Sequence, residues 1–152
     1  METVGELLAA KGSAVHGVRP TASVHETLEV MARNNIGAVV ITGEDGKLHG
    51  IFSERDFARR SIQKSLDLRT TRVKDLMTTL VVSVNPATRI AECMALMTEK
   101  HIRHLPVMDG GRLIGLVSIG DVVKSLLSVQ EMTISQQAYK MDQLETFISL
   151  AP

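Results

Sequence analysis

An internal repeat constrains the fold of this chain more than any other feature. Residues 15–43 align with residues 81–109 at an offset of 66, and residues 45–60 align with 110–125 at an offset of 65 once Glu44 is skipped. A weaker echo precedes each unit, because residues 4–8 resemble residues 73–77. Eleven aligned pairs are identical: Val15/Val81, Val18/Val84, Pro20/Pro86, Glu26/Glu92, Met31/Met97, Ile36/Ile102, Gly46/Gly111, Leu48/Leu113, Gly50/Gly115, Ser53/Ser118 and Asp56/Asp121. Such self-similarity identifies a duplicated module.

Each unit has the same predicted succession of elements. A short apolar segment, 15–18 or 80–84, is expected to form a strand that ends at a proline. A helix follows in each unit, with apolar residues at positions i, i+4 and i+7: Val24, Leu28 and Met31, then Ile90, Met94 and Met97. Two runs rich in β-branched residues then flank a glycine turn, which predicts an antiparallel hairpin. A last helix opens at Ser53 or Ser118. Each unit is therefore predicted to be β-α-β-β-α, with one parallel crossover.

The predicted fold class is α+β (mixed α/β), with two units related by a pseudo-two-fold axis. A unit of about 45 residues cannot bury enough surface alone, so we expect the two units to share a core. We expect the first unit to span 3–62 (core 15–60) and the second 73–128 (core 81–125), joined by a connector at 63–72.

The polar segment 61–72 carries three Lys and Arg against one Asp and is typical of a solvated linker. Residues 129–152 form a predicted helical tail outside both repeats. Its apolar residues recur at spacings of three or four: Ile134, Ala138, Met141, Leu144 and Ile148. That face should pack either on the module or on another subunit.

Composition excludes several classes of protein. Seventeen Lys and Arg balance seventeen Asp and Glu, which argues against a nucleic-acid-binding surface. Aromatic residues make up only 3%, so the stacking platforms of single-strand binders are missing as well. The single Cys93 excludes an internal disulfide and a multi-cysteine zinc site, and its place on a repeat helix predicts a small core residue. With no long apolar run and no signal-like N-terminus, we expect a cytoplasmic protein that does not enter a membrane.

Two copies of this pattern, each ending Gly-x-x-Ser-x-x-Asp, resemble the CBS-domain family. The motifs that carry the resemblance are residues 50–56 and 115–121, with Ile102-Arg-His-Leu-Pro-Val107 upstream of the second. The resemblance covers residues 3 to about 128. It implies a tandem (Bateman) module that binds adenosyl nucleotides such as AMP, ADP, ATP, NAD or S-adenosylmethionine between the repeats. Such modules signal energy or cofactor state to a partner enzyme or transporter. We expect no attached catalytic domain, as in small stand-alone members of the family.

The motif residues admit a structural and a functional interpretation. Ser53 with Asp56, and Ser118 with Asp121, have the spacing of a helix capping box. The resemblance implies instead that each Asp carboxylate accepts hydrogen bonds from the ribose hydroxyls and that each Ser donates to ribose or phosphate. A helix N-terminus also favours a nearby phosphate. The two interpretations are compatible.

The two repeats differ in charge. Arg55 aligns with Gly120, whereas Arg103 and His104 align with Gly37 and Ala38. The resemblance implies that Arg55, Arg103 and His104 contact phosphate, and the alternative is that Arg103 and His104 occupy a solvated strand end. Gly37 and Ala38 would let an adenine ring approach the backbone. The predicted adenine pocket comprises Val15, His16, Ile36, Gly37, Ala38, Val81, Ile102 and Pro106. Two inequivalent sites follow.

The expected function is that of a non-catalytic, nucleotide-sensing regulatory module acting as a homodimer. The alternative is an assembly module that has vestigial pockets and acts through its C-terminal helix. The sequence contains no recognisable nucleophile–base pair and no paired carboxylates, so we do not expect an enzyme. The five histidines show no metal-ligand spacing, so we do not expect a metal site.

Overall fold

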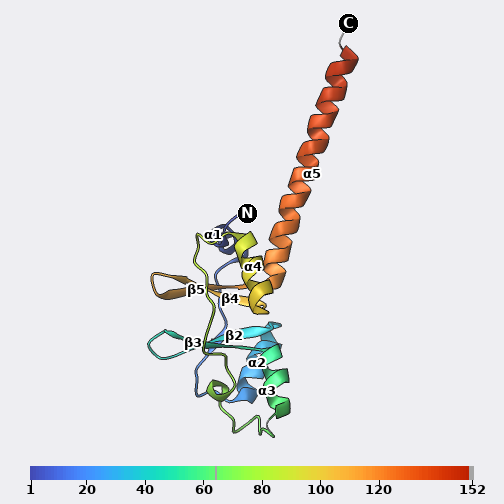
Figure 1. Ribbon diagram of the computed structural model, residues 1–152. Helices are drawn as coiled ribbons and strands as arrows, with labels where there is room; N and C mark the ends of the chain where they lie inside the picture. The colour runs from blue at the N-terminus through green and yellow to red at the C-terminus, as the bar shows by residue number, and fades with distance from the viewer. Residues whose placement is uncertain (64, 151–152) are drawn as a thin grey trace.

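The structure is a computed structural model that describes residues 1–63 and 65–150 (Figure 1). Its elements, in chain order, are α1 (Val4–Lys11), β1 (Gly17–Val18), α2 (Val24–Asn34), β2 (Ala38–Thr42), β3 (Leu48–Ser53), α3 (Glu54–Gln63), the 3-10 turn η1 (Val73–Asp75), α4 (Ile90–Lys100), β4 (His104–Asp109), β5 (Arg112–Ser118) and α5 (Ile119–Leu150). The two repeats therefore have the mixed α/β composition that the sequence predicts. Their hairpins lie one above the other, and the hairpin turns point to the same side (Figure 1).

The first repeat forms a three-stranded sheet in the order β1-β2-β3. Strand β1 pairs with β2 in parallel, and β2 pairs with β3 antiparallel, so the predicted crossover and hairpin are both present. Helix α2 makes the crossover. Its N-terminus is fixed by a capping box in which Ser23 and Glu26 satisfy each other's backbone N–H groups.

The second repeat has a two-stranded sheet, because the strand expected over 80–84 is reduced to one parallel bridge between Val84 and Val107. Pro106 explains the difference. In the first repeat the Val40 N–H donates to the His16 carbonyl at 3.2 Å. Pro106 is the aligned residue and has no N–H to donate, so the parallel ladder cannot extend there.

Two hydrophobic cores are present rather than one, and the repeats exchange segments to complete them. Helix α1 contributes Val4, Leu7 and Leu8 to the core of the second repeat. The segment around η1 contributes Val73 and Leu76 to the core of the first. An equivalent backbone hydrogen bond holds each segment in place. The Val4 N–H donates to the Thr88 carbonyl at 2.9 Å, and the Val73 N–H donates to the Ala22 carbonyl at 2.8 Å. The expectation of one core shared by both units is therefore wrong: each repeat has its own core, completed by the segment that precedes the other repeat.

The connector is partly structural rather than wholly solvated. Leu66 and Leu68 pack against the first core. The Leu68 carbonyl accepts a hydrogen bond from His25 N–H, and the Thr71 carbonyl accepts one from Val24 N–H, both at 2.9 Å. Lys64 lies outside the described residues.

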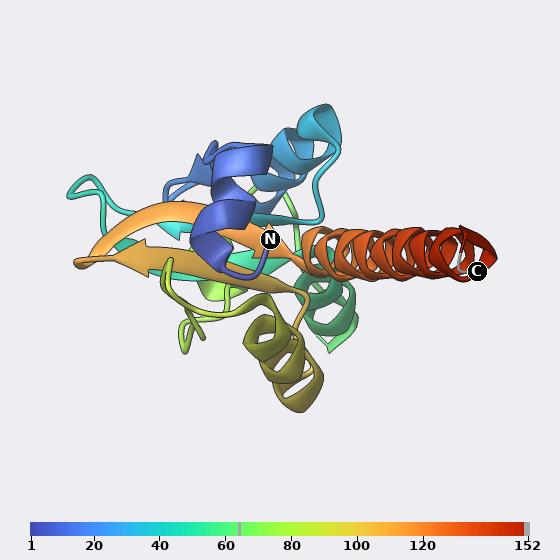
Figure 2. The ribbon, with the colours of Figure 1, turned by 90° about the horizontal axis from the view of Figure 1, so that it is seen from above.

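Helix α5 runs without a break from the second Ser-x-x-Asp motif into the tail. Its first turns pack on α4, and the remainder projects away from both repeats (Figures 1 and 2). The predicted tail is therefore helical as far as Leu150, and residues 151–152 lie outside the described residues. Among the described helices, none is both long and apolar enough to cross a membrane.

Candidate functional site

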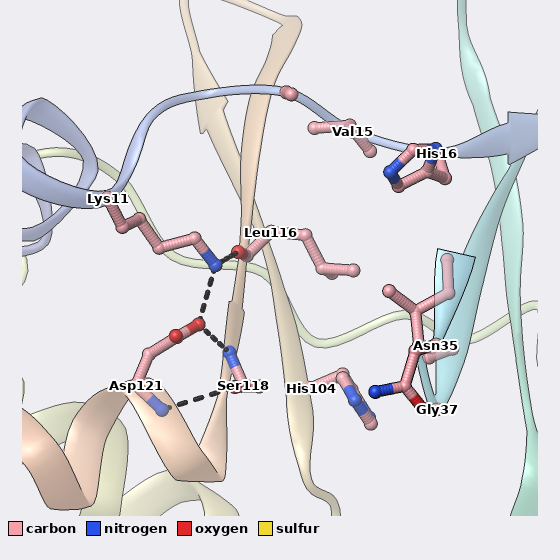
Figure 3. Close-up of a pocket in the computed structure, with 12 residues that line it drawn as sticks. Lys11, Val15, His16, Asn35, Gly37, His104, Leu116, Ser118 and Asp121 are labelled. Atoms are coloured by element: carbon pink, nitrogen blue, oxygen red, sulfur yellow. Dashed lines mark hydrogen bonds and ion pairs between the residues drawn. The ribbon is translucent and has the colours of Figure 1, made fainter. Parts of the chain in front are cut away.

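Two clefts lie between the repeats, and each is named here for its aspartate. The Asp121 cleft, of about 370 Å³, combines residues 14–16 and 35–38 of the first repeat with Leu116, Ser118 and Asp121 of the second (Figure 3). The Asp56 cleft, of about 670 Å³, combines Ile51 and residues 53–56 of the first repeat with residues 100–104 of the second. The clefts are pseudo-symmetric, because each joins a motif of one repeat to the end of the first repeat helix of the other.

Both motifs form the predicted capping boxes. The Asp56 N–H donates to Ser53 Oγ at 3.1 Å, and Ser53 N–H donates to Asp56 Oδ2 at 3.1 Å. The Asp121 N–H donates to Ser118 Oγ at 3.2 Å, and Ser118 N–H donates to Asp121 Oδ2 at 2.9 Å. A carboxylate has about four acceptor positions, so both aspartates can also accept bonds from a ligand.

Lys11 makes the two clefts electrostatically different, because it pairs with the aspartate of only one of them. Its Nζ donates to Asp121 Oδ2 at 2.6 Å and to the Leu116 carbonyl at 2.9 Å (Figure 3). Burial favours a raised pKa for Asp121, but the hydrogen bonds from Lys11 and Ser118 outweigh it, and the pKa of this carboxyl lies below its usual value. Sequence reasoning missed Lys11, which reaches the cleft only because α1 packs on the second repeat.

The corresponding segment before the second repeat, residues 76–82, contains no basic residue. There the Thr78 hydroxyl donates to Asp56 Oδ1 at 3.3 Å. The carboxylate of Asp56 therefore has a neutral partner where that of Asp121 has a cation.

The Asp56 cleft is strongly basic. Five basic side chains line it against the two acids Glu54 and Asp56; they are Arg55, Arg59, Arg60, Lys100 and Arg103. Arg60 has a structural role, because its guanidinium donates hydrogen bonds to the Leu76 and Met77 carbonyls. Arg55 reaches across the repeats to the His101 carbonyl at 3.3 Å. The predicted phosphate-contacting residues are thus gathered in one cleft.

His104 lines both clefts, and so does Gly37. Burial is the main reason that the pKa of His104 lies below its usual value, and the positive charges of Arg103 and Lys11 act in the same direction. The carboxylates of Asp121 and Asp56 oppose the shift without reversing it. The lowered pKa of His104 favours its neutral imidazole form at pH 7.

The predicted adenine-pocket residues divide between the clefts. Val15, His16, Ile36, Gly37 and Ala38 line the Asp121 cleft, and Ile102 lines the Asp56 cleft. Two others, Val81 and Pro106, line neither of these clefts. Pro106 is buried in β4, where its carbonyl accepts the Val84 N–H at 3.0 Å.

The structure adds residues that the sequence analysis did not select. Asn35 and His101 occupy aligned positions at the ends of α2 and α4, and each lines one cleft. Both residues have a left-handed backbone conformation, with φ of 50° and 54°. Asn and His are both enriched among the non-glycine residues that adopt this conformation. The helix-end position in the repeat alignment was the signal that could have identified them.

Cys93 is fully buried on α4, as predicted, and burial raises the pKa of its thiol. Within residues 1–63 and 65–150, no group of three or more His, Cys, Asp or Glu side chains could hold a metal ion.

Comparison with known proteins agrees with this architecture. The CBS domain model matches residues 12–62 and 73–128. The CBS domain-containing protein CBSX3, mitochondrial, of Arabidopsis thaliana is 35% identical over 133 residues, which cover 82% of this chain and 65% of that protein. This chain therefore spans somewhat less than two thirds of the length of that relative.

Solved structures show the same fold. A crystal structure of a CBS domain is 45% identical with a TM-score of 0.79, over 82% of this chain and 97% of that one. The crystal structure of CBSX2 in complex with AMP is 28% identical with a TM-score of 0.70, over 86% of this chain and 99% of that one. With two matched copies of the domain and exchanged segments joining them, this chain belongs to the CBS-domain family.

Proposed function

We propose that this chain is a regulatory module that binds one adenosyl nucleotide, of the AMP, ADP, ATP or NAD class, in the Asp56 cleft. The observation that carries the proposal is the gathering of five basic side chains around the Ser53–Asp56 cap at the N-terminus of α3. Arginine binds phosphate bidentately, and a helix N-terminus favours an anion. The volume of about 670 Å³ lies within the usual range for small-molecule pockets.

Within this proposal, Asp56 accepts from the ribose hydroxyls, while Arg55 and Arg103 bind the phosphate from opposite repeats. The AMP complex of CBSX2 supports this choice of ligand class. The Asp121 cleft is the weaker site for an anion, since its one cation, Lys11, is already paired with Asp121.

A ligand in the Asp56 cleft touches both repeats and therefore biases their relative position. Coupling of this kind is typically worth about 1–3 kcal/mol, enough to change the affinity for a regulated enzyme or transporter. We further propose that the protein acts in the cytoplasm and catalyses no reaction of its own.

Titration calorimetry with AMP, ADP, ATP, NAD and S-adenosylmethionine tests the proposal. Asp56→Ala should abolish the binding heat. Asp121→Ala is the control, because it removes the aligned capping bond, worth about 1 kcal/mol in stability, and should leave the heat in place. It also removes the ion pair with Lys11, which adds about 0.2–1 kcal/mol to its cost. The absence of heat with all five compounds would overturn the proposal.

The alternative is an assembly module that acts through its C-terminal helix. The exposed apolar side chains of α5 favour it. It would be preferred if no nucleotide binds while partner capture depends on residues 130–152.

A further inference from the structure

The C-terminal half of α5 is a helix without a covering surface in the single chain. Of the side chains that the structure describes between residues 127 and 150, every one is exposed. At 1.5 Å per residue, this segment extends about 36 Å beyond the body of the protein. Figures 1 and 2 show it leaving both repeats behind.

An apolar stripe with a seven-residue repeat runs along this segment. Leu127, Ile134, Met141 and Ile148 are each seven residues apart and are 53%, 65%, 59% and 70% exposed. An isolated helix whose apolar side chains face water is marginally stable. A strict seven-residue repeat is the pattern that a left-handed coiled coil buries.

We propose that a second copy of this chain covers the stripe and that the two α5 helices form a parallel, in-register, two-stranded coiled coil. The four stripe residues then occupy the a positions, and Gln130, Gln137 and Leu144 occupy the d positions. Ile at a together with Leu at d favours two parallel strands, and Ile134, Ile148 and Leu144 supply these residues at three of the seven positions.

The charges on the helix point to the same partner and orientation. In this register Lys140 is at a g position and Glu145 is at the following e position, the pair that meets between parallel strands. Residues five apart do not face each other within one helix, so the match is complementary only between two chains. In an antiparallel pair, e positions face e positions. Within residues 127–150 these are Glu131, Ala138 and Glu145, none of them basic, and the one basic e residue, Lys124, lies in the preceding heptad beside the body.

The stripe continues toward the body of the protein, since Val123, 40% exposed, is the preceding d residue. The interface is short, at about three heptads, and two d positions are glutamine. We therefore expect a reversible dimer whose population depends on protein concentration.

Sedimentation equilibrium of the full chain over a range of concentrations tests the proposal. The wild-type chain should dimerise, and Ile134→Lys should shift it to monomer. Gln136→Lys is the matched control, because it adds the same charge on the opposite, outer face of the helix and should remain dimeric. A monomeric wild-type chain, or an Ile134→Lys variant that dimerises like the control, would overturn the proposal.

Two further variants test the register. Lys140→Glu should weaken the dimer several-fold, and Lys140→Glu combined with Glu145→Lys should restore it. Ile134→Cys should form an intermolecular disulfide under oxidation, because a positions meet in a parallel, in-register pair; Cys93 is fully buried and should not compete. Failure of either the charge rescue or the cross-link would contradict the parallel arrangement. None of these outcomes depends on nucleotide binding.

Discussion

Asp56 and Asp121 have the same backbone environment but different electrostatic environments. Each caps a helix and accepts from its serine, yet Lys11 neutralises Asp121 while Thr78 faces Asp56. The difference comes from the exchanged segments rather than from the motifs. This is why we assign the anionic ligand to one cleft.

Replacing Lys11 should raise the pKa of Asp121. Lys11→Met removes a charge-assisted hydrogen bond, and the pair is partly exposed, with side chains 35% and 23% accessible. We expect a loss of about 0.2–1 kcal/mol in unfolding free energy at pH 7. Because the pKa of Asp121 is depressed in the folded state, its stabilising contribution is present above the unfolded pKa and disappears as pH falls through the folded pKa.

Carboxyl NMR titration of Asp121 in the wild type and in Lys11→Met measures the pKa change directly, and chemical denaturation at pH 7 measures the stability. An Asp121 pKa that does not change on removal of Lys11 would show that the ion pair is not formed in solution.

His104 should report nucleotide binding through its own protonation. Burial lowers its pKa in the free protein. A phosphate placed beside it in the Asp56 cleft stabilises the imidazolium, so the pKa should rise on binding and nucleotide affinity should increase as pH falls below neutral.

An NMR titration of the His104 ring protons, with and without saturating AMP, checks the direction of the shift. His104→Gln should remove this part of the pH dependence of binding while the Asp56 cleft still accepts nucleotide. An unchanged or lowered His104 pKa in the complex would place the phosphate elsewhere.

The sequence predicted the residue pairs of both clefts, because aligned motifs in a duplicated module must occupy equivalent positions. It could not predict Lys11, since no local pattern says that α1 packs on the second repeat. The sequence predicts Pro106 in the ligand pocket, whereas in the structure Pro106 has no N–H to donate and so ends the parallel pairing in the second repeat.

The glycine that opens each motif is required by the exchanged segments. A Cβ on Gly50 would lie 2.7 Å from the Thr78 carbonyl oxygen, which is backbone. A Cβ on Gly115 would lie 2.7 Å from Cδ1 of Leu8, the end of a flexible side chain. Gly50 therefore lies against rigid backbone, whereas Gly115 lies against a side chain that can move.

We therefore expect Gly50→Ala to be the more destabilising of the two substitutions. Overpacking typically costs about 1–3 kcal/mol, and Gly50→Ala should fall at the upper end because backbone must move, whereas Leu8 can change rotamer beside Gly115. Urea denaturation of both variants measures the difference. Equal losses, or a larger loss for Gly115→Ala, would contradict the close approach of Thr78 to β3.

Element types were predictable where periodicity was strong, as in α2 and α4. The structure of the connector and the full extent of α5 were harder to predict from the sequence. Leu66 and Leu68 are two apolar residues in a polar segment, too few to give a periodic signal, yet they pack on the first core. The continuity of α5 across residue 129 follows from the absence of any helix-breaking residue between Val122 and Leu150.

At the scale of the whole molecule, the sequence contains two related units and the structure contains two inequivalent clefts. The formal net charge of zero describes the whole chain and does not reveal that one cleft is basic while the other is balanced. The exchanged segments tie the two repeats together, so that a ligand bound across one cleft can affect the body from which α5 extends.

The crystal structure of the full chain grown with AMP is the most direct test of the central claim. We predict one AMP per chain in the Asp56 cleft, with its ribose hydroxyls on Asp56 and its phosphate between Arg55 and Arg103. An AMP molecule held only in the Asp121 cleft, or no bound AMP at a saturating concentration, would contradict the account.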